Sequence, residues 1–163
     1  EFIRSTPLIV QIFFIFYVGP QFGIRLSAWT SGMIAIGLHY ASYLSEVYRA
    51  GLDNVPKGQW EACKALNMGP VQIYFRIIIP QAIPPSLPGM GNYLISIFKD
   101  TPMLSVIGVA ELMHAATTIG SETYRYVEPY TLVGLIFLAM CLPTALALRQ
   151  LEARVRRKMG MNR

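Results

Sequence analysis

Apolar residues in this chain gather into long runs, with the polar residues bunched between them. The run Pro7–Pro20 would be only about 21 Å long as a helix that rises about 1.5 Å per residue, which is short for a membrane span of about 30 Å. The runs Ala28–Arg49 and Val127–Leu148 are long enough to span. We therefore predict membrane helices in these segments, the first either thinly inserted or extended by preceding residues.

A fourth run, Leu87–Val109, is apolar overall but is interrupted near its middle by Lys99–Pro102. It is either one discontinuous membrane helix that breaks at Lys99–Pro102, or two half-length helices with the charges at a surface. The first interpretation agrees better with the basic residues, because a single span here puts Arg4, the loop 51–85 and the basic tail on one side of the membrane. Residues 110–126 then form an external segment.

The segment Gly51–Pro85 is polar and bounded by prolines. Its centre, Gln59–Met68, has the pattern of a short amphipathic helix. The apolar stretch Ile73–Pro80 is too short to span. Three prolines then mark the start of the following helix, namely Pro84, Pro85 and Pro88.

Composition supports lipid as the solvent of this chain. It has 163 residues, of which 53% are hydrophobic and 14% charged, and its mean hydropathy is +0.42. Soluble domains carry about 25% charged residues. The net charge of +5 does not indicate a nucleic-acid partner, because the basic residues lie on alternate loops, as in multispanning membrane proteins. Eleven of the fourteen Lys and Arg lie in three places: Arg4, the stretch Arg49–Arg76, and the tail from Arg149.

No motif in the chain indicates an enzyme, a metal site or a cofactor. A Gly-rich phosphate loop with its lysine is absent from the sequence, so we expect any ATP to be hydrolysed on another subunit. Cys63 and Cys141 have neither metal-ligand spacing nor a disulfide partner. His39 and Glu46, seven residues apart, are the nearest approach to a catalytic pair, and they lack a third partner.

The loop 51–85 contains the most specific pattern. Glu61, Ala62 and Cys63 are followed by Asn67 and, ten residues later, by Ile77-Ile78-Ile79-Pro80. This spacing resembles the signature of ABC importer permeases, in which Glu-Ala-Ala precedes a Gly and an Ile-x-Leu-Pro. Cys63 replaces an Ala, Asn67 the Gly, and Ile79 the Leu.

The resemblance implies that this loop couples the chain to an ATPase. A short helix must lie in a cleft of that partner, with small residues (Ala62, Ala65) allowing close approach and Glu61 pairing with a basic residue. Asn67 can adopt the left-handed conformation of a helix-ending Gly, and we expect Pro80, after Ile77, to stop the element. The alternative is an ordinary amphipathic cytoplasmic helix without a coupling role.

Further stretches are similar to the polar-amino-acid permeases, in that family's order along nearly the whole chain. They are RSTPL with Val10 and Gln11, YLSEVYR at 43–49, PKGQWE at 56–61, PQA at 80–82, and Gly91-Asn92 with Lys99-Asp100-Thr101. The resemblance implies an all-α, multispanning type I permease domain over residues 1–163. That family has five spans with its C-terminus inside, so the chain, which begins without Met at Glu1, is expected to hold spans two to five.

The same resemblance implies the partners and the location. We expect two copies of an ATP-binding subunit, a second permease that is identical or homologous, and a periplasmic or lipid-anchored solute-binding protein, all at the bacterial inner membrane. The solute is expected to be a polar amino acid or a similar zwitterion. Among the subfamilies, the chain looks closest to the permeases for ectoine and hydroxyectoine.

Charged residues at membrane depth are candidates for a solute pathway, because an unpaired charge in hydrocarbon costs several kcal/mol. Lys99, Asp100 and Thr101 either line this pathway or form a fixed charge network that never touches solute. An ion-coupled transporter or channel that uses Lys99 and Asp100 is the alternative function. It would make the Glu61 pattern a coincidence.

The segment Ala28–Arg49 offers a second set of candidates. His39, Ser42 or Tyr43, and Glu46 recur at three- and four-residue spacing and so share one helix face. His39, Tyr40 and Tyr43 offer a zwitterion a hydrogen-bond donor, an acceptor and an aromatic wall for its cationic part. The alternative is that these aromatics pack against neighbouring spans and that His39 is a satisfied interior donor.

Overall fold

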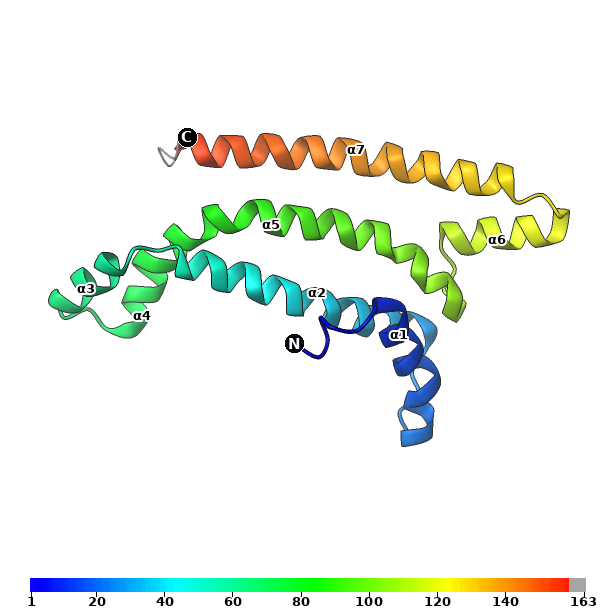
Figure 1. The fold of residues 1–163 in the computed structure, drawn as a ribbon, viewed down its shortest axis with the longest axis horizontal. Coiled ribbons are helices and arrows are strands. Elements are labelled where there is room, and N and C mark those ends of the chain that lie inside the picture. Colours follow the sequence, from blue (N-terminus) through cyan, green and yellow to red (C-terminus); the bar gives the residue numbers. More distant parts are fainter. Residues whose placement is uncertain (159–163) are drawn as a thin grey trace. The chain divides into compact units, whose positions relative to one another are not determined.

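The computed structural model describes residues 1–158, and all regular secondary structure within them is helical (Figure 1). The helices are α1 (Leu8–Phe13), α2 (Ala28–Asp53), α3 (Lys57–Ala65), α4 (Pro70–Gln72), α5 (Ile79–Asp100), α6 (Leu112–Thr123) and α7 (Val127–Lys158). Wider π-helical turns continue α1 at Phe14–Val18 and precede α5 at Ile73–Ile78. Tighter 3-10 turns occupy Gly19–Phe22 and Thr101–Ile107.

The chain forms two compact units. Unit 1 consists of Glu1–Ser42 and Leu94–Thr144, and unit 2 of Tyr43–Tyr93 with the chain from Ala145 onward. The helices α2, α5 and α7 each contribute to both units. Residues far apart in sequence therefore build each unit.

Length and composition single out α7 as a membrane span among the described residues. The stretch Val127–Val155 is long and apolar enough to cross a bilayer, and only 6% of its most apolar part is buried. A second span is obtained if Pro70–Ile107 and Leu112–Thr123, bent by 46°, count as one broken helix, whereas Leu8–Phe22 is apolar but short. The 26-residue α2 is long enough, but its second half is rich in polar residues.

The predicted start of the fourth helix is wrong. Pro84, Pro85 and Pro88 lie inside α5, and helical turns already begin at Pro70. A proline inside a soluble helix removes a backbone hydrogen bond and clashes with the preceding turn. Membrane helices tolerate proline because neighbouring helices and hydroxyl side chains satisfy the freed backbone groups. The apolar stretch Ile73–Pro80 is therefore part of a longer helical segment.

Within unit 2, α2 and α5 pack through small residues. A Cβ atom on Gly51 would collide with Ser86 Oγ and lie 2.8 Å from the carbonyl oxygen of Ala82. The Ser86 hydroxyl donates to the carbonyl oxygens of Ala82 at 2.9 Å and Val47 at 3.3 Å. Small residues at a helix crossing, with a hydroxyl bridging the backbones, are typical of membrane helix pairs.

Lys99–Pro102 marks a change of helix type and not a sharp break. The α-helix ends at Asp100 and continues as 3-10 turns, where Pro102 occupies one of the first two positions. Because Pro102 has no backbone N–H to donate to the turn before it, the carbonyl oxygen of Phe98 in that turn accepts from Thr101 Oγ1 instead. The chain turns only at Gly108, which has a φ of 79° that glycine adopts without strain. The predicted discontinuity thus lies further along the chain, between Ile107 and α6.

Candidate functional site

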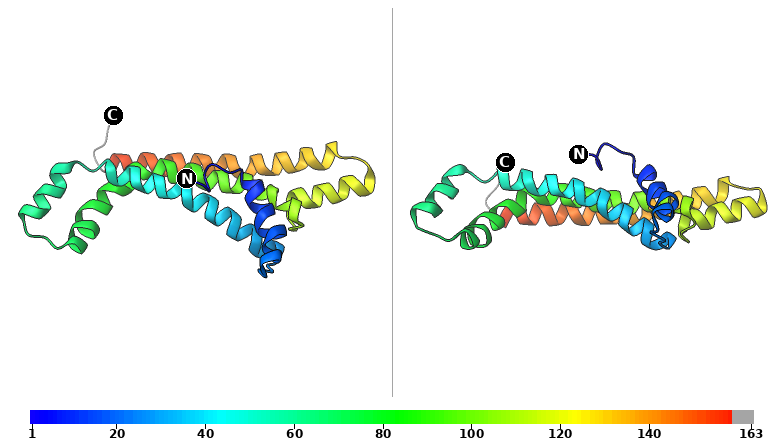
Figure 2. Two further views of the ribbon diagram at one scale, coloured as in Figure 1. Left: turned by 60° about the horizontal axis from the view of Figure 1, so that its bottom comes forward. Right: turned by 90° about the horizontal axis from the view of Figure 1, so that it is seen from below.

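The helix α3 lies in unit 2 and is anchored by one apolar face. Cys63 is buried together with Val55, Ile73, Ile78 and Ala82, and Trp60 and Met68 pack against this cluster. Figure 2 shows α3 and α4 as a helical hairpin that leaves the end of α2 and returns into α5. The cluster therefore holds α3 in place from within the loop.

Two further contacts fix α3 against the segment that follows it. The indole of Trp60 meets the ring of Tyr74 edge to face, with 5.3 Å between ring centroids. Gln81 Nε2 donates to Gln59 Oε1 at 3.3 Å and to the carbonyl oxygen of Ile77 at 2.9 Å. Packing, a ring contact and a hydrogen bond thus tie α3 to the segment that leads into α5.

Asn67 terminates α3 in the way expected from its chemistry. Its φ of 52° is in the left-handed region, as predicted. The N–H of Met68 donates to the carbonyl oxygen of Cys63, and the N–H of Asn67 to that of Lys64. This is the Schellman pattern, which satisfies carbonyls that a helix end would otherwise leave unpaired.

The residues predicted to contact an ATPase divide into two groups. Glu61, Ala62 and Ala65 are exposed on the outer face of α3. Cys63 and Ile77 face the apolar cluster and so support the helix from inside. Pro80 does not stop the element, contrary to the prediction, because α5 directly continues the helical turns of Ile73–Ile78 and membrane helices tolerate proline within such a segment.

Three of the predicted pathway residues of unit 1, His39, Tyr40 and Asp100, lie in two hydrogen-bonded pairs. Tyr40 is 5% exposed, and its hydroxyl donates to Asp100 Oδ2. His39 Nδ1 lies 3.2 Å from Gln11 Oε1. Since this amide oxygen only accepts, His39 carries its proton on Nδ1. Asp100 thus has a structural partner, which favours a fixed network over an ion relay.

Gln11 is a partner of His39 that the sequence did not single out. Its amide nitrogen donates to the carbonyl oxygens of Ile3 at 2.7 Å and Thr6 at 3.1 Å, and lies 2.8 Å from Thr6 Oγ1. These three acceptors fix the amide, so that its oxygen is the atom that meets His39. The sign of this role in the sequence is that Gln11 is the one amide side chain within the apolar run Pro7–Pro20.

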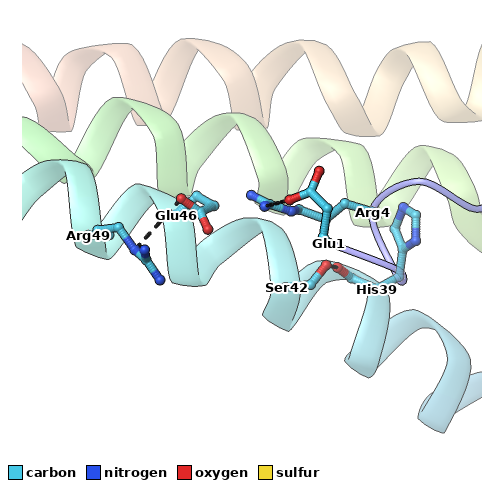
Figure 3. A network of polar contacts seen from close by, with 6 residues as sticks. All are labelled: Glu1, Arg4, His39, Ser42, Glu46 and Arg49. Atoms are coloured by element: carbon cyan, nitrogen blue, oxygen red, sulfur yellow. Dashed lines mark hydrogen bonds and ion pairs between the residues drawn. The ribbon is translucent and has the colours of Figure 1, made fainter.

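The remaining pathway candidates have other surroundings. Thr101 Oγ1 donates to the carbonyl oxygen of Phe98 at 2.8 Å, and Lys99 is exposed. In unit 2, the ring of Tyr43 lies 5.4 Å from that of Tyr93. Glu46 pairs with Arg49 at 3.8 Å, one of the two ion pairs in Figure 3, together with Arg4 and Glu1 at 2.5 Å. The seven candidates therefore divide between the two units.

Two features of the described residues bear on ligand chemistry. Residues 1–158 contain no group of three His, Cys, Asp or Glu side chains placed to hold a metal ion. A pocket of about 240 Å³ in unit 1 lies beside Gln11 and has apolar walls from Phe14, Ile15, Ala35 and Leu38. Its lining gives a zwitterion few polar partners.

Comparisons with known proteins match nearly the whole chain to one protein family and to its members. Residues 1–157 match the family described as binding-protein-dependent transport system inner membrane component. A probable amino-acid ABC transporter permease, y4tG of Sinorhizobium fredii, is 46% identical over 149 residues, which are 91% of this chain and 64% of that protein. The L-cystine transport permease TcyB of Bacillus subtilis is 40% identical, covering 95% of this chain and 67% of TcyB.

A solved structure shares the fold. The crystal structure of an amino acid ABC transporter with histidines is 40% identical, with a TM-score of 0.86 over 94% of this chain and 72% of that one. The chain thus spans about two-thirds of the length of the curated relatives that it matches.

Proposed function

Because the chain belongs to the family of binding-protein-dependent transport system inner membrane components, we propose that it is part of the permease of a bacterial ABC importer for an amino acid. In this proposal it crosses the inner membrane several times and provides the solute's route into the cytoplasm. The names of its relatives support amino-acid transport, since they include permeases for L-cystine, octopine and, as a probable assignment, glutamine.

The proposed solute is a polar amino acid or a similar zwitterion. Ectoine and hydroxyectoine, which the sequence resemblance favours, are the specific candidates within this class. The described residues offer donors, acceptors and aromatic rings on α2, but Tyr40 already donates to Asp100. His39 and Glu46 likewise have partners in Gln11 and Arg49. His39, Tyr40, Tyr43 and Glu46 therefore stand on equal terms as candidates for solute contact.

The proposed partners are two ATP-binding subunits, a second permease subunit and a solute-binding protein. The ATP-binding subunits are required because the chain has no phosphate loop of its own. Their docking site is the outer face of α3, where Glu61, Ala62 and Ala65 are exposed. Since α3 is anchored to the start of α5, movement of the ATP-binding subunits would be passed to a membrane helix.

The observation that supports the proposal most directly is that α3 is packed on one face and exposed on the other. Its test is Glu61→Lys in the reconstituted complex, measured as solute-stimulated ATP hydrolysis and as uptake into vesicles. We expect uptake to fall at least about tenfold, since one lost charge-assisted contact at an interface costs about 2 kcal/mol or more. The matched control is Glu122→Lys, which makes the same charge change at an exposed residue of α6.

Wild-type uptake in the Glu61→Lys complex would contradict the coupling role of α3. Equal losses in the two variants would mean that the charge change acts through general destabilisation. Uptake driven by an ion gradient without any ATP-binding subunit would replace the proposal by the ion-coupled alternative.

A further inference from the structure

The helix α7 continues well beyond its apolar part. Residues 127–148 are apolar enough to span and would be about 33 Å long, whereas the whole helix of 32 residues is about 48 Å long. The segment 149–158 therefore extends about 15 Å past a hydrocarbon core of about 30 Å. It contains five basic residues and one acidic residue. The continuous helix holds these charges at the membrane surface.

The acidic residue of this segment is turned toward α5. Within unit 2, a Cβ atom on Gly91 would lie 3.4 Å from Glu152 Oε1 and 3.5 Å from Leu148 Cδ1. Residues four apart share a helix face, so Leu148 and Glu152 together form the side of α7 that packs on α5. Glu152 is accordingly half-buried.

The other sides of the segment are cationic. Arg149, Arg154 and Arg157 are all exposed. At about 100° per residue, Arg154 and Arg157 lie on the side of the helix opposite to Leu148 and Glu152. Because the one carboxylate faces α5, it does not offset the charge of this outer face.

We propose that Arg149, Arg154 and Arg157 bind the phosphate groups of anionic phospholipids in the adjacent leaflet. Arg149 directly follows the apolar part of α7, at the depth of the headgroup layer. Arg154 and Arg157 reach back toward this layer through their long side chains. Guanidinium groups bind phosphate oxygens in bidentate fashion, and basic segments next to a membrane helix are attracted to anionic leaflets.

An acidic protein surface is the rival occupant, and the position of the arginines disfavours it. The first arginine comes directly after the last apolar residue of the span, so that lipid phosphates are its nearest anions in any membrane with anionic lipid. The inference rests on the membrane-spanning role of α7 in the proposed function, but not on transport of any solute.

The test measures lipid preference in the complete transporter complex. The complex is placed in phosphatidylcholine nanodiscs that contain spin-labelled phosphatidylglycerol or spin-labelled phosphatidylcholine, and the fraction of motionally restricted label is recorded. We expect a preference for phosphatidylglycerol that weakens as salt is raised. Arg154→Gln/Arg157→Gln should reduce the relative association constant by about fivefold per arginine, whereas Arg154→Lys/Arg157→Lys should retain most of it.

The matched control is Arg25→Gln/Arg125→Gln, which removes the same charge from two exposed arginines of the segments predicted to lie on the other side. An unchanged preference in Arg154→Gln/Arg157→Gln, or an equal loss in the control, would overturn the proposal. Loss of the ATP-binding subunit from this variant with an unchanged lipid preference would assign the arginines to a protein partner and would also overturn it. Because lipid binding is measured without solute, either failure leaves the proposed transport function standing.

Discussion

The helix α3 in unit 2 and the polar residues of α2 in unit 1 differ in where their polar groups find partners. Glu61 and two alanines are exposed on the outer face of α3, while its inner face packs on the apolar cluster. The C-terminal end of the helix is closed by backbone hydrogen bonds. In contrast, Tyr40 and His39 are bonded to Asp100 and Gln11 inside the chain. Substitution should therefore affect assembly and coupling at α3 but stability at α2.

The largest loss of stability is expected where α2 crosses α5, the two helices between which α3 lies in the sequence. In Gly51→Ala the new Cβ would meet Ser86 Oγ and, at 2.8 Å, the carbonyl oxygen of Ala82, and a backbone atom cannot move aside cheaply. We expect a loss of about 3 kcal/mol, at the upper end for overpacking, visible as a large drop in the melting temperature of the purified complex. The control is Gly37→Ala in the same helix, where no atom lies within 4 Å.

Gly32→Ala is the corresponding substitution in unit 1. Its Cβ would lie 2.7 Å from Cδ2 of Leu104, but here the neighbour is the end of a flexible side chain. The loss should be smaller than that of Gly51→Ala. A greater loss at Gly32 would mean that the packing of unit 1 is the stiffer of the two.

The next effect separates a structural role of Asp100 from a transport role. Tyr40→Phe keeps the ring but removes the hydroxyl that donates to Asp100. Because Tyr40 is buried, the carboxylate loses a donor that water does not easily replace, and we expect a loss of about 2 kcal/mol. Asp100→Asn should cost less in the Tyr40→Phe background than alone, as a double-mutant cycle of melting temperatures would measure.

Additive losses in this cycle would contradict the pairing of Tyr40 and Asp100. Glu61→Ala is the counterpart in α3, and it should leave the melting temperature unchanged while lowering uptake. If Glu61→Ala destabilised the complex as much as Tyr40→Phe, the contrast between the two regions would be lost.

The helical class and the main helix positions were predictable because apolar runs of sufficient length reveal them. The starts of α2 at Ala28 and of α7 at Val127 were predicted correctly, and the all-helical permease fold is confirmed. The end of α7 was not, because hydropathy falls at Arg149 while Arg, Leu, Glu and Ala continue to favour helix. The prolines of α5 led to a wrong helix start in the prediction. The rule that proline ends a helix comes from soluble proteins and does not hold for packed membrane helices.

The candidate site was predictable only where spacing along one helix determines it. The division of α3 into an outer face and a packed face follows from helical periodicity. The partner of His39 does not, because Gln11 lies 28 residues away and meets it only through the fold. The same holds for Tyr40 and Asp100, which are 60 residues apart.

The smallest expected effect tests how α3 ends. Asn67 adopts a φ of 52°, where a residue with an ordinary Cβ is strained and glycine is not. Asn67→Ala should therefore cost about 1 kcal/mol, whereas Asn67→Gly should be neutral or slightly stabilising and would restore the residue of the resembled signature. The measurement is the rate of limited proteolysis near Met68 and Gly69 in the reconstituted complex. Faster cleavage in Asn67→Ala but not in Asn67→Gly is expected, because the Schellman hydrogen bonds of Asn67 and Met68 depend on the left-handed turn. Equal cleavage rates in both variants would mean that the packing of Cys63 and Trp60, and not the turn, holds this end of α3 in place.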